Sequence, residues 1–115
     1  MPDPSHGVEY FEIPAERTDE LRGFYSSLFG WQFEEGHAKN YWTISNAGIS
    51  GGLAPKQSPE EMPTMFITVE SVDDYVSKAK QLNAKVTKGK QEIEEGYYAI
   101  LEDPQGNTFG IWQAR

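Results

Sequence analysis

Two residues of one short segment carry side chains that could do acid–base chemistry. Tyr10 and Glu12 lie in residues 8–13, where residue types alternate as they do in a β-strand. Side chains two residues apart in a strand point to the same face, so the phenol and the carboxylate are expected side by side. A carboxylate buried among aromatic rings can have a raised pKa and act as a general acid or base. Tyr10 and Glu12 are therefore the candidate catalytic residues.

The other reactive residue types indicate little further chemistry. The chain has no cysteine, which excludes disulfides, thiol nucleophiles and cysteine-ligated metal sites. His6 lies in the N-terminal segment and His37 in a predicted turn between strands, and both are interpreted as exposed and solvated. The glycines at 48, 51 and 52 lack the lysine and helix start of a phosphate-binding loop.

Composition limits the compartment and the partners. The 115 residues suffice for about one domain, and 37% of them are hydrophobic. A net charge of −8 repels nucleic acids and anionic membrane surfaces, and no apolar run is long enough to span a bilayer. The N-terminal residues lack the pattern of a signal peptide. We expect a cytoplasmic protein with a small-molecule ligand and with neither nucleic acid nor membrane as partner.

The first half of the chain is predicted to contain one strand, one helix and three further strands. Pro14 is expected to end strand 8–13, Thr18 to cap the following helix, and Gly30 to close it. The stripe of the helix that is predicted to be buried comprises Leu21, Phe24, Tyr25 and Leu28. The three strands are predicted at residues 31–33, 40–45 and 49–54.

The second half repeats this order. After strand 64–69, Ser71 and Asp74 form a capping-box pattern at the start of a helix, and Asn83 is expected to close it. The predicted buried stripe comprises Val72, Tyr75, Val76, Ala79 and Leu82. Strands are predicted near 85–87, 97–102 and 107–113, with a tight turn at 103–106. The sequence predicts one domain, 1–115, made of modules at about 7–54 and 64–113 that are joined by a linker at 55–63.

Three short motifs, in this order, carry a resemblance to a known family. They are Phe24-Tyr25, Leu28-Phe29-Gly30-Trp31, and the segment Leu101-Glu102-Asp103-Pro104-Gln105-Gly106-Asn107. Together they resemble the vicinal oxygen chelate superfamily, which includes glyoxalase I, extradiol dioxygenases, and fosfomycin and bleomycin resistance proteins. The resemblance implies an α+β fold in which two βαβββ modules form an open, curled mixed β-sheet, a half-barrel around a cavity, with the helices outside.

The resemblance also implies where a metal ion would bind in the metalloenzymes of that superfamily. There, His, Gln or Glu side chains from the first and last strands of each module hold a divalent cation. The equivalent positions in this chain are Tyr10, Gly52, Thr64 and Gly110. Glycine has no side-chain donor, and a threonine hydroxyl is a poor ligand for a divalent transition metal. We therefore expect no metal and no other cofactor.

The residues expected to line the cavity form an aromatic cup with one carboxylate in its wall. They are Tyr10, Glu12, Trp42, Ser50, Gly52, Thr64, Phe66, Thr68, Thr108, Gly110 and Trp112. Two interpretations of this cup remain open. In one, the aromatic rings fill the barrel and a threonine or tyrosine hydroxyl satisfies Glu12. In the other, Gly52 and Gly110 leave space in which an organic molecule lies between aromatic faces.

Two classes of function follow from the cup and from the missing ligands. The first is a metal-free small-molecule binding protein of the glyoxalase or bleomycin resistance type. The second is a lyase, isomerase or dioxygenase of the superfamily that uses Glu12 and Tyr10 as acid and base, or an atypical metal site. Members of this superfamily frequently pair modules between chains, so a homodimer is expected.

Overall fold

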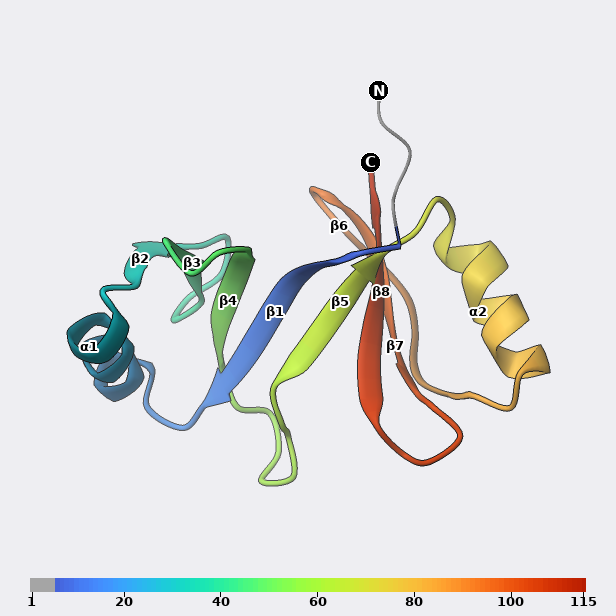
Figure 1. Ribbon diagram of the computed structural model, residues 1–115, viewed down its shortest axis with the longest axis horizontal. Helices are drawn as coiled ribbons and strands as arrows, with labels where there is room; N and C mark the ends of the chain where they lie inside the picture. The colour runs from blue at the N-terminus through green and yellow to red at the C-terminus, as the bar shows by residue number, and fades with distance from the viewer. Residues whose placement is uncertain (1–5) are drawn as a thin grey trace. The chain divides into compact units, whose positions relative to one another are not determined.

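The computed structural model describes residues 6–115 and divides the chain into two compact units. One unit comprises residues 10–64, and the other joins residues 6–9 with residues 65–115. The order of one strand, one helix and three strands occurs twice along the chain (Figure 1). This confirms the α+β class. Neither helix within residues 6–115 is long and apolar enough to cross a membrane.

The unit of residues 10–64 contains a mixed sheet of four strands with one helix. Its elements are β1 (Val8–Ala15), which belongs to this unit from Tyr10 onward, α1 (Thr18–Phe29), β2 (Gln32–Glu35), β3 (Trp42–Ser45) and β4 (Ser50–Pro55). The strands lie in the order β2-β3-β4-β1. β1 and β4 are parallel, whereas β2, β3 and β4 pair in antiparallel fashion. The core of this unit is formed by Ala15, Ile44 and Leu53.

Pro14 does not end the first strand. It pairs with Ala54, and the parallel ladder continues to Ala15, which pairs with Pro55. A proline removes one backbone donor, and near the end of a strand the ladder tolerates that loss. The prediction that the strand stops at Ile13 was wrong by two residues.

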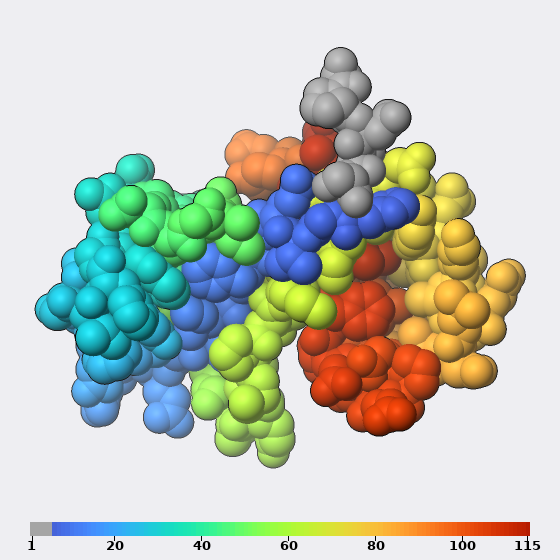
Figure 2. Space-filling model, viewed as in Figure 1, coloured from blue at the N-terminus to red at the C-terminus, as the bar shows by residue number. Residues whose placement is uncertain are grey.

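Helix α1 packs less of its apolar surface than its sequence pattern indicates. Leu21 contacts the core, but Phe24 and Leu28 are 53% and 58% exposed. The side chains of α1, cyan in Figure 2, form part of the outer surface of this unit. The predicted buried stripe was therefore wrong for Phe24 and Leu28, which the rest of this unit does not cover.

The two ends of α1 differ in how well they were predicted. Thr18 is the first residue of the helix and is buried, and Arg17 takes the N-cap position without a side-chain cap. The predicted cap at Thr18 was wrong. Gly30 adopts the left-handed conformation, with a φ of 76°, and donates a hydrogen bond to the carbonyl of Ser26, as predicted.

The second unit has the same layout. Its elements are β5 (Thr64–Thr68), which belongs to this unit from Met65 onward, α2 (Val72–Gln81), β6 (Lys85–Ile93), β7 (Gly96–Glu102) and β8 (Thr108–Ala114). The strands lie in the order β5-β8-β7-β6, with β5 and β8 parallel and the other pairs antiparallel. β6 is far longer than the predicted 85–87, and its pairing with β7 is interrupted by two shifts in register. The core comprises Val69, Val72, Ala99, Leu101 and Ile111.

The caps and turns of this unit follow the sequence closely. The Ser71 hydroxyl accepts a hydrogen bond from the Asp74 amide at 3.1 Å, and Asn83 follows α2 in the left-handed conformation. The Asp103 carboxylate accepts bonds from the amides of Gln105 and Asn107, which fix the predicted turn between β7 and β8. These bonds, chiefly those from Asn107, hold the pKa of Asp103 below its usual value.

Candidate functional site

The alternation of β1 places Tyr10 and Glu12 on one face of their sheet. Phe11 and Ile13 pack on the opposite face against the core that contains Leu53. Tyr10 and Glu12 are half-buried and lie beside β4, where Glu12 pairs with Gly52. The predicted sharing of a face by the phenol and the carboxylate is confirmed within this unit.

A third side chain, Tyr41, completes a polar cluster that we call the tyrosine–glutamate cluster: Tyr10, Glu12 and Tyr41. The Tyr41 hydroxyl donates a hydrogen bond to Glu12 Oε2 at 3.0 Å. It also forms a short hydrogen bond with the Tyr10 hydroxyl. Because the single Tyr41 proton points to Glu12, Tyr10 must be the donor in the bond between the two phenols. The two hydrogen bonds therefore run in one direction, from the Tyr10 hydroxyl to the Tyr41 hydroxyl and from the Tyr41 hydroxyl to the Glu12 carboxylate.

The loop before β3 directs Tyr41 into the cluster. Asn40 adopts a left-handed conformation with a φ of 62°, and the Gly36 amide donates to the Tyr41 carbonyl at 2.8 Å. A side chain at Gly36 would press on the Tyr41 ring, since a Cβ atom there would lie 2.6 Å from Cδ1. The ring of His37 lies 4.7 Å from the Tyr41 ring, centroid to centroid, so this exposed histidine contacts the cluster at its margin.

The hydroxyls of Tyr10 and Tyr41 lie directly against Gly52. A Cβ atom at Gly52 would overlap the Tyr41 hydroxyl and lie 2.5 Å from the Tyr10 hydroxyl. The space that a longer side chain would need is therefore filled by the protein's own tyrosines. The expectation that Gly52 leaves room for a ligand is wrong at this position, and Glu12 is satisfied by a tyrosine hydroxyl, as in the first interpretation of the cup.

The environment keeps Tyr41 protonated. Burial, followed by the negative charge of Glu12 and the bond with Tyr10, raises the pKa of Tyr41 far above its ordinary value. An ionised Tyr41 would place a second negative charge beside the carboxylate in a partly desolvated site. Tyr41 is consequently a hydrogen-bond donor to Glu12 and not a source of protons near neutral pH.

Tyr41 was not among the residues predicted to line the cavity, whereas its neighbour Trp42 was. Trp42 packs against the core of its unit, and the guanidinium carbon of Arg22 lies 3.8 Å from its ring centroid. Trp42 is therefore on the opposite face from the cluster. The signal for Tyr41 was the glycine in β4, because a glycine inside a strand marks the close approach of another group.

None of the remaining predicted site residues is a member of the cluster, although Ser50 pairs with Tyr10 in the register of β1 and β4. Ser50 is exposed on β4, and the Thr64 hydroxyl donates to the carbonyl of Met62 at 3.2 Å. On the second unit, a Cβ atom at Gly110 would overlap the ring of Phe66, so this glycine also accommodates an aromatic side chain. The remaining three positions on that unit are Thr68, which donates to Glu9 Oε1 at 2.6 Å, the exposed Thr108 and the half-buried Trp112.

The side chains at the four equivalent positions do not fit a metal ion. Tyr10 is engaged with Tyr41, Thr64 with a backbone carbonyl, and Gly52 and Gly110 offer no donor. Across residues 6–115, no group of three or more His, Cys, Asp or Glu side chains is arranged to hold a metal. The donor set of the cluster, one carboxylate and two phenols, lacks the imidazole and thiolate groups that transition metals prefer.

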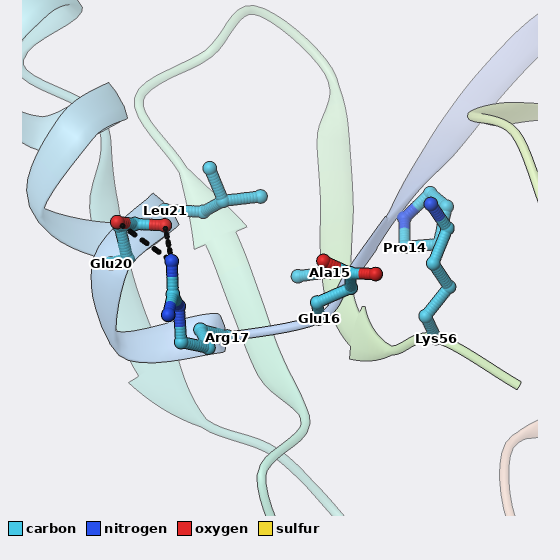
Figure 3. Close-up of a pocket in the computed structure, with 7 residues that line it drawn as sticks. All are labelled: Pro14, Ala15, Glu16, Arg17, Glu20, Leu21 and Lys56. Atoms are coloured by element: carbon cyan, nitrogen blue, oxygen red, sulfur yellow. Dashed lines mark hydrogen bonds and ion pairs between the residues drawn. The ribbon is translucent and has the colours of Figure 1, made fainter. Parts of the chain in front are cut away.

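Each unit also has a surface cavity away from the predicted cup. In the unit of residues 10–64, a cavity of about 270 Å³ lies where β1 passes into α1 (Figure 3). Two of the charged side chains that line it form an ion pair with each other, Arg17 with Glu20 at 3.2 Å. The second unit has a cavity of about 330 Å³ beside α2.

Two comparisons of the sequence with known proteins agree with each other. A family model described as a glyoxalase-like domain matches residues 11–112. A curated protein of Mycobacterium tuberculosis (strain CDC 1551 / Oshkosh), named "Putative glyoxylase CFP32", is 28% identical over 115 residues, covering 89% of this chain and 44% of the relative. The chain therefore spans less than half the length of that relative.

Solved structures share the fold at low sequence identity. A glyoxalase/bleomycin resistance protein/dioxygenase superfamily member from Vibrio splendidus 12B01 matches with a TM-score of 0.71, 10% identity, and coverage of 90% of this chain and 96% of the other. The Mn(II)-bound glyoxalase from Novosphingobium aromaticivorans matches with a TM-score of 0.68, 15% identity, and coverage of 97% and 40%. At these identities the likeness concerns the fold alone.

Proposed function

Because this chain belongs to the glyoxalase-like domain family, we propose that it is a small-molecule-binding protein that works without a metal ion. The observation that carries the proposal is the hydrogen bond from Tyr41 to Glu12 over Gly52. Beside the positions where the superfamily resemblance places metal ligands, this chain has a carboxylate ordered by a neutral phenol. Such a group is prepared to accept hydrogen bonds from an organic ligand.

The ligand class that suits this site is an organic cation. Glu12 supplies a negative charge that is half-buried and held in position by Tyr41, so binding costs little further ordering. The rings of Tyr10 and Tyr41 supply aromatic faces, which attract cationic groups. The net charge of −8 adds a long-range attraction for positively charged compounds.

The test uses metal-free bleomycin, a cationic glycopeptide, as the probe in isothermal titration calorimetry. We expect the wild-type protein to bind it, and Glu12→Gln to lower the affinity at least tenfold, because each lost charge-assisted hydrogen bond costs roughly 1.5–3 kcal/mol. Glu34→Gln, which removes an exposed carboxylate from the same unit, is the matched control. Equal affinities for the two variants, or a stoichiometric transition metal in the purified protein, would contradict the proposal.

The direction of these hydrogen bonds also suggests a second candidate function. In a lyase or isomerase, Glu12 would take a proton from the substrate while Tyr41 remains neutral, since its raised pKa makes it a poor acid. Methylglyoxal with glutathione is a suitable probe. Turnover by the wild-type protein that disappears in Glu12→Gln favours the enzyme, whereas binding without turnover favours the binding protein.

A further inference from the structure

The second unit contains a cavity that the proposed function does not use. It has a volume of about 330 Å³ and lies between α2 and the strands β7 and β8. This volume is at the lower end of the range for small-molecule sites, which is roughly 300–1,000 Å³. Its lining residues are His6, Tyr75, Lys78, Ala79, Leu82, Leu101, Phe109 and Ile111.

The floor of this cavity is apolar. Leu101 and Ile111 belong to the core of the unit, and Phe109 and Ala79 pack against it. Leu82 belongs to the predicted buried stripe of α2, yet it is 66% exposed at the cavity. An apolar ligand in this cavity would cover part of that surface, which the fold of the unit leaves in contact with water.

The polar groups of the lining are mainly cationic or neutral. Lys78 lies 5.5 Å from the centroid of the Tyr75 ring and forms no ion pair with any residue from 6 to 115. The Nε2 atom of His6 lies 2.9 Å from the Tyr75 hydroxyl, so the histidine that was interpreted as solvated has a defined partner. One carboxylate is near, since Glu70 lies 3.8 Å from His6.

We propose that this cavity is a second binding site, which takes a short-chain carboxylic acid with its apolar chain on the core residues and its carboxylate at Lys78. The Lys78 ammonium forms no ion pair in the described part of the chain, so it is available to a carboxylate whose apolar chain lies on the floor of the cavity. The Tyr75 hydroxyl, positioned by His6, lies on the same rim and offers a further hydrogen bond. This site is independent of Glu12.

The test measures binding of octanoate and octylammonium to the full chain by calorimetry. We expect octanoate to bind, octylammonium to bind at least tenfold more weakly, and Lys78→Met to lower the octanoate affinity at least tenfold. Lys80→Met is the matched control, because Lys80 is on the same helix but does not line the cavity. Equal losses in the two lysine variants would overturn the proposal, since they would reveal a general charge effect.

Two further variants test whether octanoate binds in this cavity. Ala79→Phe fills the cavity and is expected to abolish octanoate binding while leaving the thermal midpoint of unfolding within a few degrees of wild type. If that variant fails to fold, the comparison of Lys78→Met with Lys80→Met still decides the outcome. Glu12→Gln is expected to bind octanoate normally. Loss of octanoate binding in Glu12→Gln, or no binding by the wild-type protein, would overturn the second site.

Discussion

The Tyr41 hydroxyl donates a hydrogen bond of 3.0 Å to the Glu12 carboxylate, across two segments that are separated by 29 residues in sequence. This bond fixes the loop before β3 to the first strand of its sheet. It also determines the protonation state of Tyr41, because the adjacent negative charge opposes ionisation of the phenol. The consequences for stability can be measured directly.

Removing the Tyr41 hydroxyl is expected to destabilise the protein and to change its response to alkaline pH. Tyr41→Phe should lower the free energy of unfolding by about 1.5–3 kcal/mol, the usual contribution of a hydrogen bond to a charged group. The pKa of Tyr41 is raised in the folded state, so its stabilisation is complete below the ordinary tyrosine pKa of about 10 and is lost as the pH rises above it. Urea unfolding at pH 7 and at pH 11 measures both effects.

Tyr25→Phe is the control for that experiment. Tyr25 stacks on Trp31, with ring centroids 4.9 Å apart, outside the tyrosine–glutamate cluster. The Tyr25→Phe variant should lose stability at alkaline pH as the wild-type protein does. In Tyr41→Phe, the share of this loss that is due to Tyr41 should be absent. Identical pH profiles for the two variants would show that Tyr41 titrates normally in the folded state.

Adding one methyl group at Gly52 should disrupt the cluster. The Cβ atom of Gly52→Ala would overlap the Tyr41 hydroxyl, and the displaced phenol would leave Glu12 without this donor. We expect a loss of about 1–3 kcal/mol, typical of overpacking at a closely packed position. Gly89→Ala is the matched control in a strand, because a Cβ atom added there would meet nothing within 4 Å. Equal stability of the two variants would contradict the close approach of the two phenols to Gly52.

Two leucines of the same unit should differ sharply when truncated. Leu53 is fully buried in β4, so Leu53→Ala should cost about 2–5 kcal/mol through lost burial and the cavity left behind. Leu28 is 58% exposed on α1, so Leu28→Ala should stay within about 0.5 kcal/mol of wild type. Thermal unfolding of both variants decides this. A large loss at Leu28 would mean that another surface covers the helix in solution.

Apart from the N-cap of α1, the caps and turns named above were predicted well from the sequence, because those signals depend on a few neighbouring atoms. The left-handed cap at Gly30, the hydroxyl cap at Ser71 and the turn around Asp103 all need only short-range hydrogen bonds. The order of elements in each unit followed from these signals and from the alternation of apolar residues.

The parts that were missed depend on contacts between distant segments. Whether Leu28 is buried depends on which other segments pack over α1, and helix periodicity does not encode this. Tyr41 lies just before β3, in a loop whose direction is set by the left-handed Asn40, so strand alternation could not orient it. The side chain that fills the space at Gly52 could be identified only once both segments were placed.

Gly52 also constrains how position 52 could acquire a metal-ligating side chain by mutation. A single change of Gly52 to histidine or glutamate would not supply a ligand, because the new side chain would first collide with the hydroxyls of Tyr41 and Tyr10. Both tyrosines would have to shorten or turn away at the same time, and Glu12 would lose its donor when Tyr41 did so. A metal ligand at position 52 therefore requires several coupled substitutions.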